Sequence, residues 1–416
     1  MNFTEKITKI VTDAEMGLSG VFADFDRIAQ ENTARVIDSF RAHRVSEAMF
    51  AGSTGYGYGD TGREALDAIY ADVFGAEAAF VRHNIVNGTQ ALSIGLFGLL
   101  RPGDVMLSIS GAPYDTLAEV IGDKYRNGDG SLADFGVQYD EVGLTPDGKF
   151  DLPIIYEKIA KYGDNLKVVF IQRSKGYQNR PTFAPQDFKE ISDYVHSHSK
   201  AYVVVDNCYG EFCDTSEPTS FGADMIIGSL IKNPGGGIAE TGGYIAGTKR
   251  AVELASYRLT TVGIGTECGC TLGEMRKMFK GFFMAPHVVA QAKKTAALAA
   301  YVFAELGYDV EPSYFDARHD IIQTVKLYDA DKLCAFCRGI QMGSPVDSYV
   351  TPEPWDMPGY EDKVIMAAGT FTAGSSIEIS ADGPLRYPFT AYFQGGLTYE
   401  SGKYAIMTAA DEILSL

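Results

Sequence analysis

Short apolar runs alternate with longer amphipathic segments along residues 63–306, and this alternation constrains the fold more than any other feature of the sequence. Two of the runs, 168–171 and 202–205, read Val-Val-Phe-Ile and Tyr-Val-Val-Val and carry no charged residue. Such runs are typical of strands that are buried on both faces. Strands that alternate with helices form a mostly parallel sheet with helices on both sides. The pattern therefore predicts a large α/β domain.

The same pattern places the individual elements. Strands are expected at 78–82, 104–109, 167–172, 201–205, 224–228 and 243–246. Helices are expected at 63–74, 89–100, 115–122, 186–198, 249–258 and 287–306. After about residue 307 the rhythm changes, and we expect strands at 321–326, 375–379 and 389–393 around a helix at 331–341. We therefore predict an N-terminal helical segment (1–50), a large α/β domain (51–306) and a smaller C-terminal α+β domain (307–416).

The charge of the chain argues against several classes of partner. The formal net charge is −18, and an acidic surface repels phosphate backbones, so we expect no nucleic-acid partner. Apolar runs stay far short of the roughly 20 residues that span a bilayer, and residues 1–9 contain no signal-peptide core. We therefore expect a cytoplasmic protein without a membrane partner. The six cysteines do not suggest a disulfide framework.

No metal site is expected either. Cys334 and Cys337 form a CxxC, but Cys268 and Cys270 supply no convincing second pair, and the six histidines are scattered. Zinc sites need four clustered ligands. We interpret Cys334 and Cys337 as small thiols that pack a helix.

Two residues that follow predicted strands have the most distinctive chemistry. Asp206 follows Ala-Tyr-Val-Val-Val directly, and a carboxylate at the exit of a buried strand is costly unless it has a partner. A protonated pyridinium nitrogen would be such a partner; capping of a helix is the alternative. Lys232 lies three residues after Ser229, in Ser-Leu-Ile-Lys-Asn-Pro-Gly-Gly-Gly. A lysine in an enclosed site can form a Schiff base, and Ser229 could donate to a phosphate oxygen.

Two further positions suit a phosphorylated, flat cofactor. Gly88, Thr89 and Gln90 precede an apolar helix, and the N–H groups at a helix N-terminus bind anions; simple capping is the alternative. Tyr114 follows the strand at 104–109 and could stack on a heteroaromatic ring, or be an ordinary core tyrosine. The order of these features along the chain predicts a pyridoxal 5′-phosphate (PLP) site.

With these residues in place, the chain resembles a known group, the PLP enzymes of the aspartate aminotransferase fold (fold type I). More narrowly, it is similar to the methionine γ-lyase and cystathionine β-lyase-like proteins labelled aluminium resistance proteins. The stretches that carry the resemblance are GAPYDTL, VVFIQRSKGY, VVVDNCYGEF, GSLIKNPGGGIAETGGYIAG, EISADGPLRYPF and QGGLTYE. The resemblance runs from about residue 50 to 400 and implies a PLP-dependent enzyme.

The resemblance also implies roles for residues of this chain. Lys232 would be the Schiff-base lysine and would move the proton at Cα of the substrate. Asp206 would pair with the pyridine nitrogen, and Tyr114 would stack on the ring. The phosphate would be held by Gly88, Thr89 and Ser229, with Gln90 in doubt because many relatives have His there.

Lyases of this group also share their sites between subunits, which implies a homodimer or homotetramer. Their usual Tyr-x-Arg corresponds here to Tyr56-Gly57-Tyr58, so Tyr58 replaces the arginine. The candidates that could compensate are Arg63, Arg258 and Lys175. A guanidinium suits the substrate carboxylate, and Arg386 is our candidate, with Arg173 and Arg180 as competitors.

The resemblance implies a carbon–sulfur lyase that acts on a sulfur-containing amino acid such as cystathionine, cysteine or methionine, by β- or γ-elimination. Because fold does not fix function, two alternatives stay open. One is another PLP reaction on the same fold, such as that of an aldolase, transaminase or desulfurase. The other is a non-catalytic relative linked to metal resistance.

Overall fold

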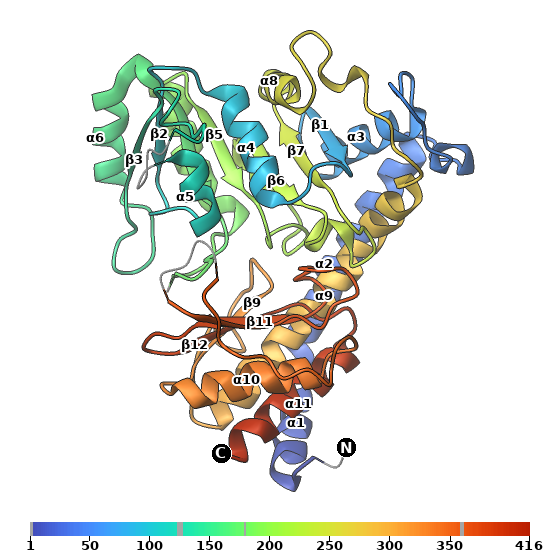
Figure 1. The fold of residues 1–416 in the computed structure, drawn as a ribbon, viewed down its shortest axis with the longest axis vertical. Coiled ribbons are helices and arrows are strands. Elements are labelled where there is room, and N and C mark those ends of the chain that lie inside the picture. The colour runs from blue at the N-terminus through green and yellow to red at the C-terminus, as the bar shows by residue number, and fades with distance from the viewer. Residues whose placement is uncertain (1–2, 123–127, 179, 358–361) are drawn as a thin grey trace. The chain divides into compact units, whose positions relative to one another are not determined.

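The computed structural model describes residues 3–122, 128–178, 180–357 and 362–416, which form two compact units (Figure 1). Unit 1 comprises Met1–Thr33, Ile231–Glu240 and Gly281–Leu416, and unit 2 comprises Ala34–Leu230 and Thr241–Lys280. The division differs from the three parts expected from the sequence, because the N-terminal helices share a core with the C-terminal elements and the short segment 231–240 leaves the large unit.

The elements that the structure describes follow the chain in this order. The helices are α1 (Glu5–Gly17), α2 (Ser19–Ala42), α3 (Thr61–Val73), α4 (Gly88–Leu99), α5 (Asp115–Ile121), α6 (Leu152–Tyr162), α7 (Phe188–His198), α8 (Lys249–Leu259), α9 (Met275–Glu305), α10 (Ala330–Met342) and α11 (Tyr399–Leu414). The strands are β1 (Ala78–Arg82), β2 (Val105–Ser108), β3 (Gln138–Glu141), β4 (Leu166–Gln172), β5 (Tyr202–Asp206), β6 (Met225–Ser229), β7 (Gly243–Gly247), β8 (Asp309–Glu311), β9 (Ile322–Lys326), β10 (Val364–Ala367), β11 (Ser380–Pro384) and β12 (Thr390–Gln394).

A seven-stranded sheet forms the centre of unit 2, in the order β1-β7-β6-β5-β4-β2-β3. Strand β7 runs antiparallel to β1 and β6, whereas β6, β5, β4, β2 and β3 pair in parallel. The expected mostly parallel α/β sheet is therefore confirmed. Each parallel strand connects to the next through a crossover, so the carboxyl ends of β2, β4, β5 and β6 meet at one edge of the sheet.

Both faces of this sheet are buried, as the continuous apolar runs predicted. Phe170 and Val204 point to one face and join a core with α4, α5 and α8. Val169, Ile171 and Val203 alternate with them and are fully buried as well. Because successive side chains of a strand point to opposite faces, the core continues on both sides, and the strand ends are the part of the sheet that a ligand can reach.

Unit 1 is built on a five-stranded antiparallel sheet in the order β10-β11-β12-β9-β8. Helices α10 and α11 approach each other closely at Gly339, which has no side chain. A Cβ at this position would lie 2.4 Å from the Cα of Ala409. Ile7 and Val11 of α1 pack into the same core as Val302 of α9. Two long helices, α2 and α9, each contribute residues to both units.

Several expected boundaries were wrong. Helix α9 starts at Met275 rather than 287, because Pro286 is tolerated inside it. Residues 375–379 form no strand; the neighbouring strand β11 begins at Ser380 instead. The expectation also lacked β3, α6 and α11. Within the described residues, no helix is long and apolar enough to span a membrane.

Candidate active site

Polar residues end four neighbouring parallel strands of unit 2. Ser108 ends β2, Gln172 ends β4, Asp206 ends β5 and Ser229 ends β6. Gln172 and Asp206 lie directly opposite each other in the sheet. All four side chains are buried. In open α/β sheets this edge is where ligands bind, so the strand ends define the candidate site.

Asp206 is buried, and backbone N–H groups donate to both its carboxylate and its carbonyl. Asp206 is 7% exposed, and its Oδ1 accepts a hydrogen bond from the Cys208 N–H at 3.1 Å. Its backbone carbonyl accepts from the Arg173 N–H at 3.0 Å. The first bond orients the carboxylate, and the second ties the end of β5 to the loop that follows β4.

The start of α4 and the end of β6 lie close together and form a corner that is the candidate anion site. Asn87 caps α4 by accepting from the Gln90 N–H at 2.8 Å. A Cβ on Gly88 would lie 3.4 Å from the Cys208 Sγ and 3.6 Å from the Ser229 Cβ. Gly88 and Ser229, far apart in sequence, are therefore close together.

Ser229 shows that this corner suits a hydrogen-bond acceptor. It is 1% exposed, and its Oγ has no hydrogen-bond partner among the described residues. A buried hydroxyl without a partner is costly. A phosphate oxygen at the N-terminus of α4 would accept from this hydroxyl and interact favourably with the helix dipole, so the residues present fit the phosphate of PLP.

Two of the predicted phosphate-binding residues have other contacts. The Thr89 Oγ1 lies 2.8 Å from the Thr116 Oγ1, which links α4 to α5. The Gln90 Oε1 accepts from the Val86 N–H at 2.6 Å, so this side chain turns back onto the loop before α4. Contact of Thr89 or Gln90 with a cofactor stays a prediction.

Tyr114 is held by a residue that the sequence did not point to. Its backbone N–H donates to the Gln172 Oε1 at 2.6 Å. The Tyr114 ring lies 6.2 Å from the Tyr177 ring, measured between centroids, at an interplanar angle of 55°. Gln172 also donates to the Ser174 carbonyl at 3.1 Å. Gln172 ends a buried strand, but nothing near it in the sequence indicates that its side chain meets Tyr114.

Lys232 follows Ser229 by three residues and begins the short turn Asn233–Gly235. It is half-buried. The glycines after it allow close backbone contact: a Cβ on Gly236 would lie 2.4 Å from the Gly281 carbonyl oxygen. The absence of side chains in Gly235–Gly237 thus lets the lysine segment lie directly against α9.

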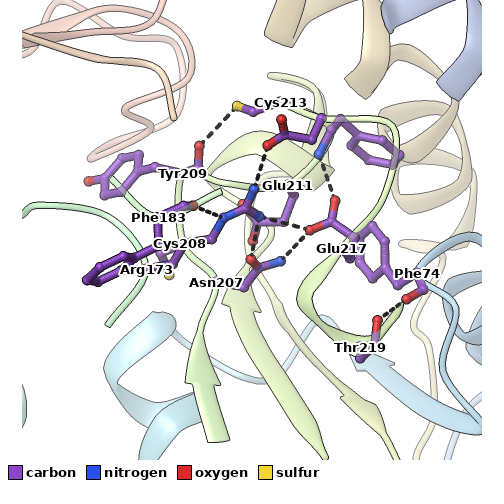
Figure 2. Close-up of polar contacts among 12 residues, drawn as sticks. Phe74, Arg173, Phe183, Asn207, Cys208, Tyr209, Glu211, Cys213, Glu217 and Thr219 are labelled. Carbon is purple, nitrogen blue, oxygen red and sulfur yellow. Dashed lines mark hydrogen bonds and ion pairs between the residues drawn. The ribbon is translucent and has the colours of Figure 1, made fainter. Parts of the chain in front are cut away.

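A network of buried charges surrounds Arg173, which follows β4 (Figure 2). Its Nη1 donates to the Asn207 Oδ1 at 2.8 Å and lies 3.1 Å from the Glu217 Oε2, and its Nη2 lies 2.8 Å from the Asp214 Oδ2. The Asn207 Nδ2 donates to Glu217 at 3.0 Å. Burial alone would lower the pKa of Arg173, but the Glu217 and Asp214 carboxylates raise it above its usual value.

Arg173 and Arg180, the competing candidates for the substrate carboxylate, are thus engaged inside unit 2. The Arg180 Nη2 donates to the carbonyls of Gln172 and Ser174 at 2.8 and 2.5 Å. Its guanidinium also lies 5.0 Å from the centre of the Phe183 ring. Both arginines organise the loop after β4.

Arg386 lies in unit 1, in the turn between β11 and β12. Its side chain is 55% exposed, and its Nη1 is 3.5 Å from the Asp362 Oδ2. This is a surface ion pair, and such pairs are weak. A role for Arg386 in binding the substrate carboxylate stays a prediction.

The tyrosines of the predicted shared site are on the surface of the chain. Tyr56 and Tyr58 are 76% and 63% exposed, and their rings stack with centroids 5.6 Å apart. Arg63 is buried beneath them and donates to the carbonyls of Gly57, Gly269 and Glu267 at 2.7, 2.6 and 3.1 Å. Arg63 is therefore occupied by the backbone.

The two other candidates for the missing arginine differ in burial. Arg258 is exposed, and its Nε donates to the Phe97 carbonyl at 3.2 Å. Lys175 is fully buried in the loop after β4. Which of them compensates stays a prediction.

Comparison with known proteins decides the family. The family model described as methionine gamma-lyase matches residues 7–414, almost the whole chain. The chain belongs to the methionine gamma-lyase family. This confirms the resemblance noted in the sequence.

Relatives of similar length are known. A carbon-sulfur lyase involved in aluminium resistance from Clostridium novyi has 49% identity and a TM-score of 0.95, with 99% of this chain and 96% of that chain covered. A Listeria monocytogenes protein, named provisionally as a cystathionine beta-lyase involved in aluminium resistance, has 48% identity and a TM-score of 0.95, with coverages of 98% and 100%. An uncharacterized Bacillus subtilis protein is 49% identical, with coverages of 99% and 97%.

More distant solved structures share the fold alone. A PLP-dependent protein from Escherichia coli has 15% identity and a TM-score of 0.63, with coverages of 93% and 96%. The expected fold type I architecture is confirmed, and the family and neighbours are lyases and PLP-dependent proteins.

Proposed function

We propose that this protein is a PLP-dependent carbon–sulfur lyase that acts on a sulfur-containing amino acid of the cystathionine, cysteine or methionine type. The observation that carries the proposal is the corner formed by Gly88 and Ser229, with its buried hydroxyl that lacks a partner. Asp206, a buried carboxylate at the end of the adjacent strand β5, supports it. The names of the close relatives favour carbon–sulfur bond cleavage.

Different residues of the chain would bind the phosphate, the ring nitrogen and the aldehyde of the cofactor. The hydroxyl of Ser229 and the N-terminus of α4 at Gly88 and Thr89 would hold the phosphate. The carboxylate of Asp206 would hold the proton of the pyridine nitrogen, and Lys232 would bind the aldehyde carbon. Bound PLP supplies an electron sink for the charge that develops at Cα of the substrate.

The reaction needs proton transfers that Lys232 and Tyr114 can make. The Lys232 amine would remove the proton at Cα of the bound amino acid. The sulfur would then leave Cβ as a thiolate and become a thiol by taking up a proton from Lys232 or from the Tyr114 hydroxyl. In γ-elimination a second proton is removed from Cβ before the sulfur leaves Cγ. In both cases one water is consumed, and a thiol, a 2-oxo acid and ammonia are released.

Arg386 is our candidate for binding the substrate carboxylate. Its guanidinium is exposed and paired with Asp362 at 3.5 Å, so a substrate carboxylate would replace a weak surface partner. Tyr56 and Tyr58 are exposed on one chain, which suits a role in the site of a neighbouring subunit. We accordingly propose a homodimer or homotetramer and a cytoplasmic location.

The experiment that tests the proposal starts from the purified protein loaded with PLP. Borohydride reduction should attach the cofactor to the peptide that contains Lys232, and Lys232→Ala should lose this adduct and the visible absorption band. Cystathionine, cysteine and methionine are then assayed for thiol and 2-oxo acid. A reduced adduct on another lysine would refute the assignment of Lys232. Amino-group transfer or carbon–carbon cleavage without thiol release would favour a transaminase or an aldolase.

The role of Ser229 has a matched control in the same unit. Ser229→Ala should weaken PLP binding by about 10- to 150-fold, since a hydrogen bond to a charged group contributes about 1.5–3 kcal/mol. Ser192, in α7, is also buried with an Oγ that lacks a partner among the described residues. Ser192→Ala should leave the dissociation constant of PLP unchanged. Equal effects of the two substitutions would contradict the phosphate role of Ser229.

A further inference from the structure

We propose that Arg173 is a positioning residue, whose guanidinium fixes the loop 207–217 and thereby holds the Asp206 carboxylate in the orientation that a ring nitrogen requires. This inference rests on the proposed PLP site and gives Arg173 a role in it other than binding the substrate carboxylate. Arg173 reaches Asp206 by two routes, one through its backbone and one through its side chain.

The backbone route is a direct hydrogen bond. The Arg173 N–H donates to the Asp206 carbonyl at 3.0 Å, which continues the pairing of β4 with β5 to the end of both strands. The next residue, Asn207, donates its N–H to the Ile227 carbonyl at 2.9 Å. The main chain on either side of the Asp206 side chain is therefore fixed by both neighbouring strands.

The side-chain route passes through the loop that begins after Asp206. The guanidinium binds the start of this loop at Asn207 and its far end at Asp214 and Glu217 (Figure 2). Between these points lies the Cys208 N–H, which donates to the Asp206 Oδ1 at 3.1 Å. One planar cation thus holds together the two ends of the loop that orients the carboxylate.

The shape of the loop depends on the guanidinium being present. A Cβ on Gly210 would lie 2.5 Å from the Arg173 Nη1, so the loop passes directly over the cation. Tyr209 and Phe212 have φ angles of 73° and 62°, which side chains with a Cβ rarely adopt. A strained backbone persists only where surrounding contacts determine it. Here they include the contacts of Arg173 with Asn207, Asp214 and Glu217, together with hydrogen bonds within the loop.

The carboxylates of the loop also indicate that it depends on Arg173. Glu217 and Asp214 are carboxylates in contact with Arg173, and Glu217 is fully buried. Glu217 also accepts the Phe212 N–H at 3.0 Å. Without the guanidinium these carboxylates would repel each other in a medium of low dielectric constant. The loop would then rearrange, and the Cys208 N–H would leave the Asp206 Oδ1.

The test measures how strongly the protein recognises the ring nitrogen of the cofactor. Apoprotein is titrated with PLP and with the analogue in which a CH group replaces the ring nitrogen. The dissociation constant of the analogue divided by that of PLP isolates the contribution of Asp206, because both compounds share the phosphate and the aldehyde. In the wild-type protein PLP should bind more tightly, and in Asp206→Ala the two should bind about equally.

Arg173→Met should reduce this ratio by about 10- to 100-fold, the range expected when an outer partner of a ligand-binding group is lost. Arg82→Met is the matched control. Arg82 is a buried arginine on β1, three strands away from β5, and its Nη1 lies 2.6 Å from the Asp67 Oδ1. The Arg82→Met protein should be less stable than the wild type but should keep the wild-type ratio of dissociation constants. The pH dependence of the visible absorption band should likewise change in Arg173→Met and not in Arg82→Met.

The outcomes separate the two levels of the proposal. A wild-type ratio in folded Arg173→Met, or an equal loss in Arg82→Met, overturns the positioning role and leaves the PLP site intact. A wild-type ratio in Asp206→Ala overturns the PLP role of Asp206 and this inference with it. If Arg173→Met does not fold, Arg173→Lys replaces it. A single ammonium group cannot reach Asn207, Asp214 and Glu217 together, so the ratio should again fall, and an unchanged ratio overturns the inference.

Discussion

Arg63 and Arg173 are two of the largest fully buried side chains of unit 2, and they differ in their main partners. Arg173 contacts two carboxylates and the Asn207 side chain. Arg63 donates to three backbone carbonyls, of Gly57, Gly269 and Glu267. Each cation fixes a loop, one after Asp206 and the other at the exposed tyrosines.

The main partners of the two arginines differ in charge, and this difference matches the position of each loop. The carbonyls that Arg63 binds are neutral, and its ion pair with the exposed Glu64 carboxylate is long, at 3.8 Å. The contacts of Arg63 therefore mainly fix the shape of the backbone. The Asp60 side chain supports the same region: it accepts from the Arg63 N–H at 2.9 Å and from the Thr271 hydroxyl at 2.7 Å. The contacts of Arg173 balance buried negative charge next to Asp206. The loop next to Asp206, which would present a charge to a ligand, therefore has a charged support, and the surface loop at Tyr56 and Tyr58 has a mainly neutral one.

The largest expected effect is on stability at Arg173. Arg173→Met should lower the free energy of unfolding by about 3–5 kcal/mol, because it leaves buried carboxylates without their cation. Urea denaturation at neutral pH measures this change. A loss below about 1 kcal/mol would mean that water already shields Asp214 and Glu217, and the contrast with Arg63 would disappear.

Arg63→Met should cost less, about 1–3 kcal/mol, since it leaves polar but uncharged groups unpaired. The change should be local. Limited proteolysis should detect faster cleavage near Gly57 or Gly269, with no change near Asp206. If Arg63→Met destabilises the chain more than Arg173→Met, charge is not what distinguishes the two sites.

The two regions should also respond to pH in opposite directions. Burial raises the pKa of Glu217, although Arg173 opposes this. For Asp60, burial alone would raise the pKa, but hydrogen bonds from Ser53, the Arg63 N–H and Thr271 hold it below its usual value of 3.8. A carboxyl with a raised pKa loses its stabilising contribution as pH rises through that pKa, whereas one with a lowered pKa loses it as pH falls.

The stabilities of Asp60→Asn and Glu217→Gln relative to the wild type test these signs. The cost of Asp60→Asn should be full at about pH 7 and shrink below pH 3.8. The stability of Glu217→Gln relative to the wild type should improve as pH rises above the ordinary glutamate value of 4.5. Urea denaturation across this range checks both, and the same sign for the two variants would contradict the comparison.

The smallest effect is expected at the surface of the Arg63 region. Tyr58→Ala should change the free energy of unfolding of the isolated chain by less than about 0.5 kcal/mol, because Tyr58 is exposed. It should nevertheless weaken PLP binding if the tyrosine serves a neighbouring subunit. An unchanged dissociation constant of PLP in the assembled protein would argue against a shared site.

Much of the fold could be predicted because the strands of unit 2 are local apolar runs. The expected strand at 78–82 matches β1, and that at 201–205 matches β5 within one residue. The prediction failed where tertiary packing overrides local preference. Pro286 lies inside α9. Residues 376–379 alternate polar and apolar side chains as a strand does, but they lie in a loop before β11.

The residues of the candidate site likewise include some that the sequence predicts and others that it does not. Asp206 and Ser229 could be proposed from the sequence because each follows an apolar run directly, and Gly88 because it opens an apolar helix. Gln172 could not, since nothing local indicates that its side chain meets the Tyr114 N–H 58 residues away. Arg173 and Arg63 looked like ligand-binding cations, because sequence does not show whether a charge already has a partner.

The sequence by itself determined the alternation of strands and helices and the order of the chemical groups, because periodicity and turn residues act over a few neighbours. Only the tertiary structure decided which groups meet. It brought Gly88 close to Ser229 and left one hydroxyl without a partner. It also enclosed Arg173 in carboxylates and Arg63 in carbonyls, because the partners of a buried charge come from loops that are distant along the chain.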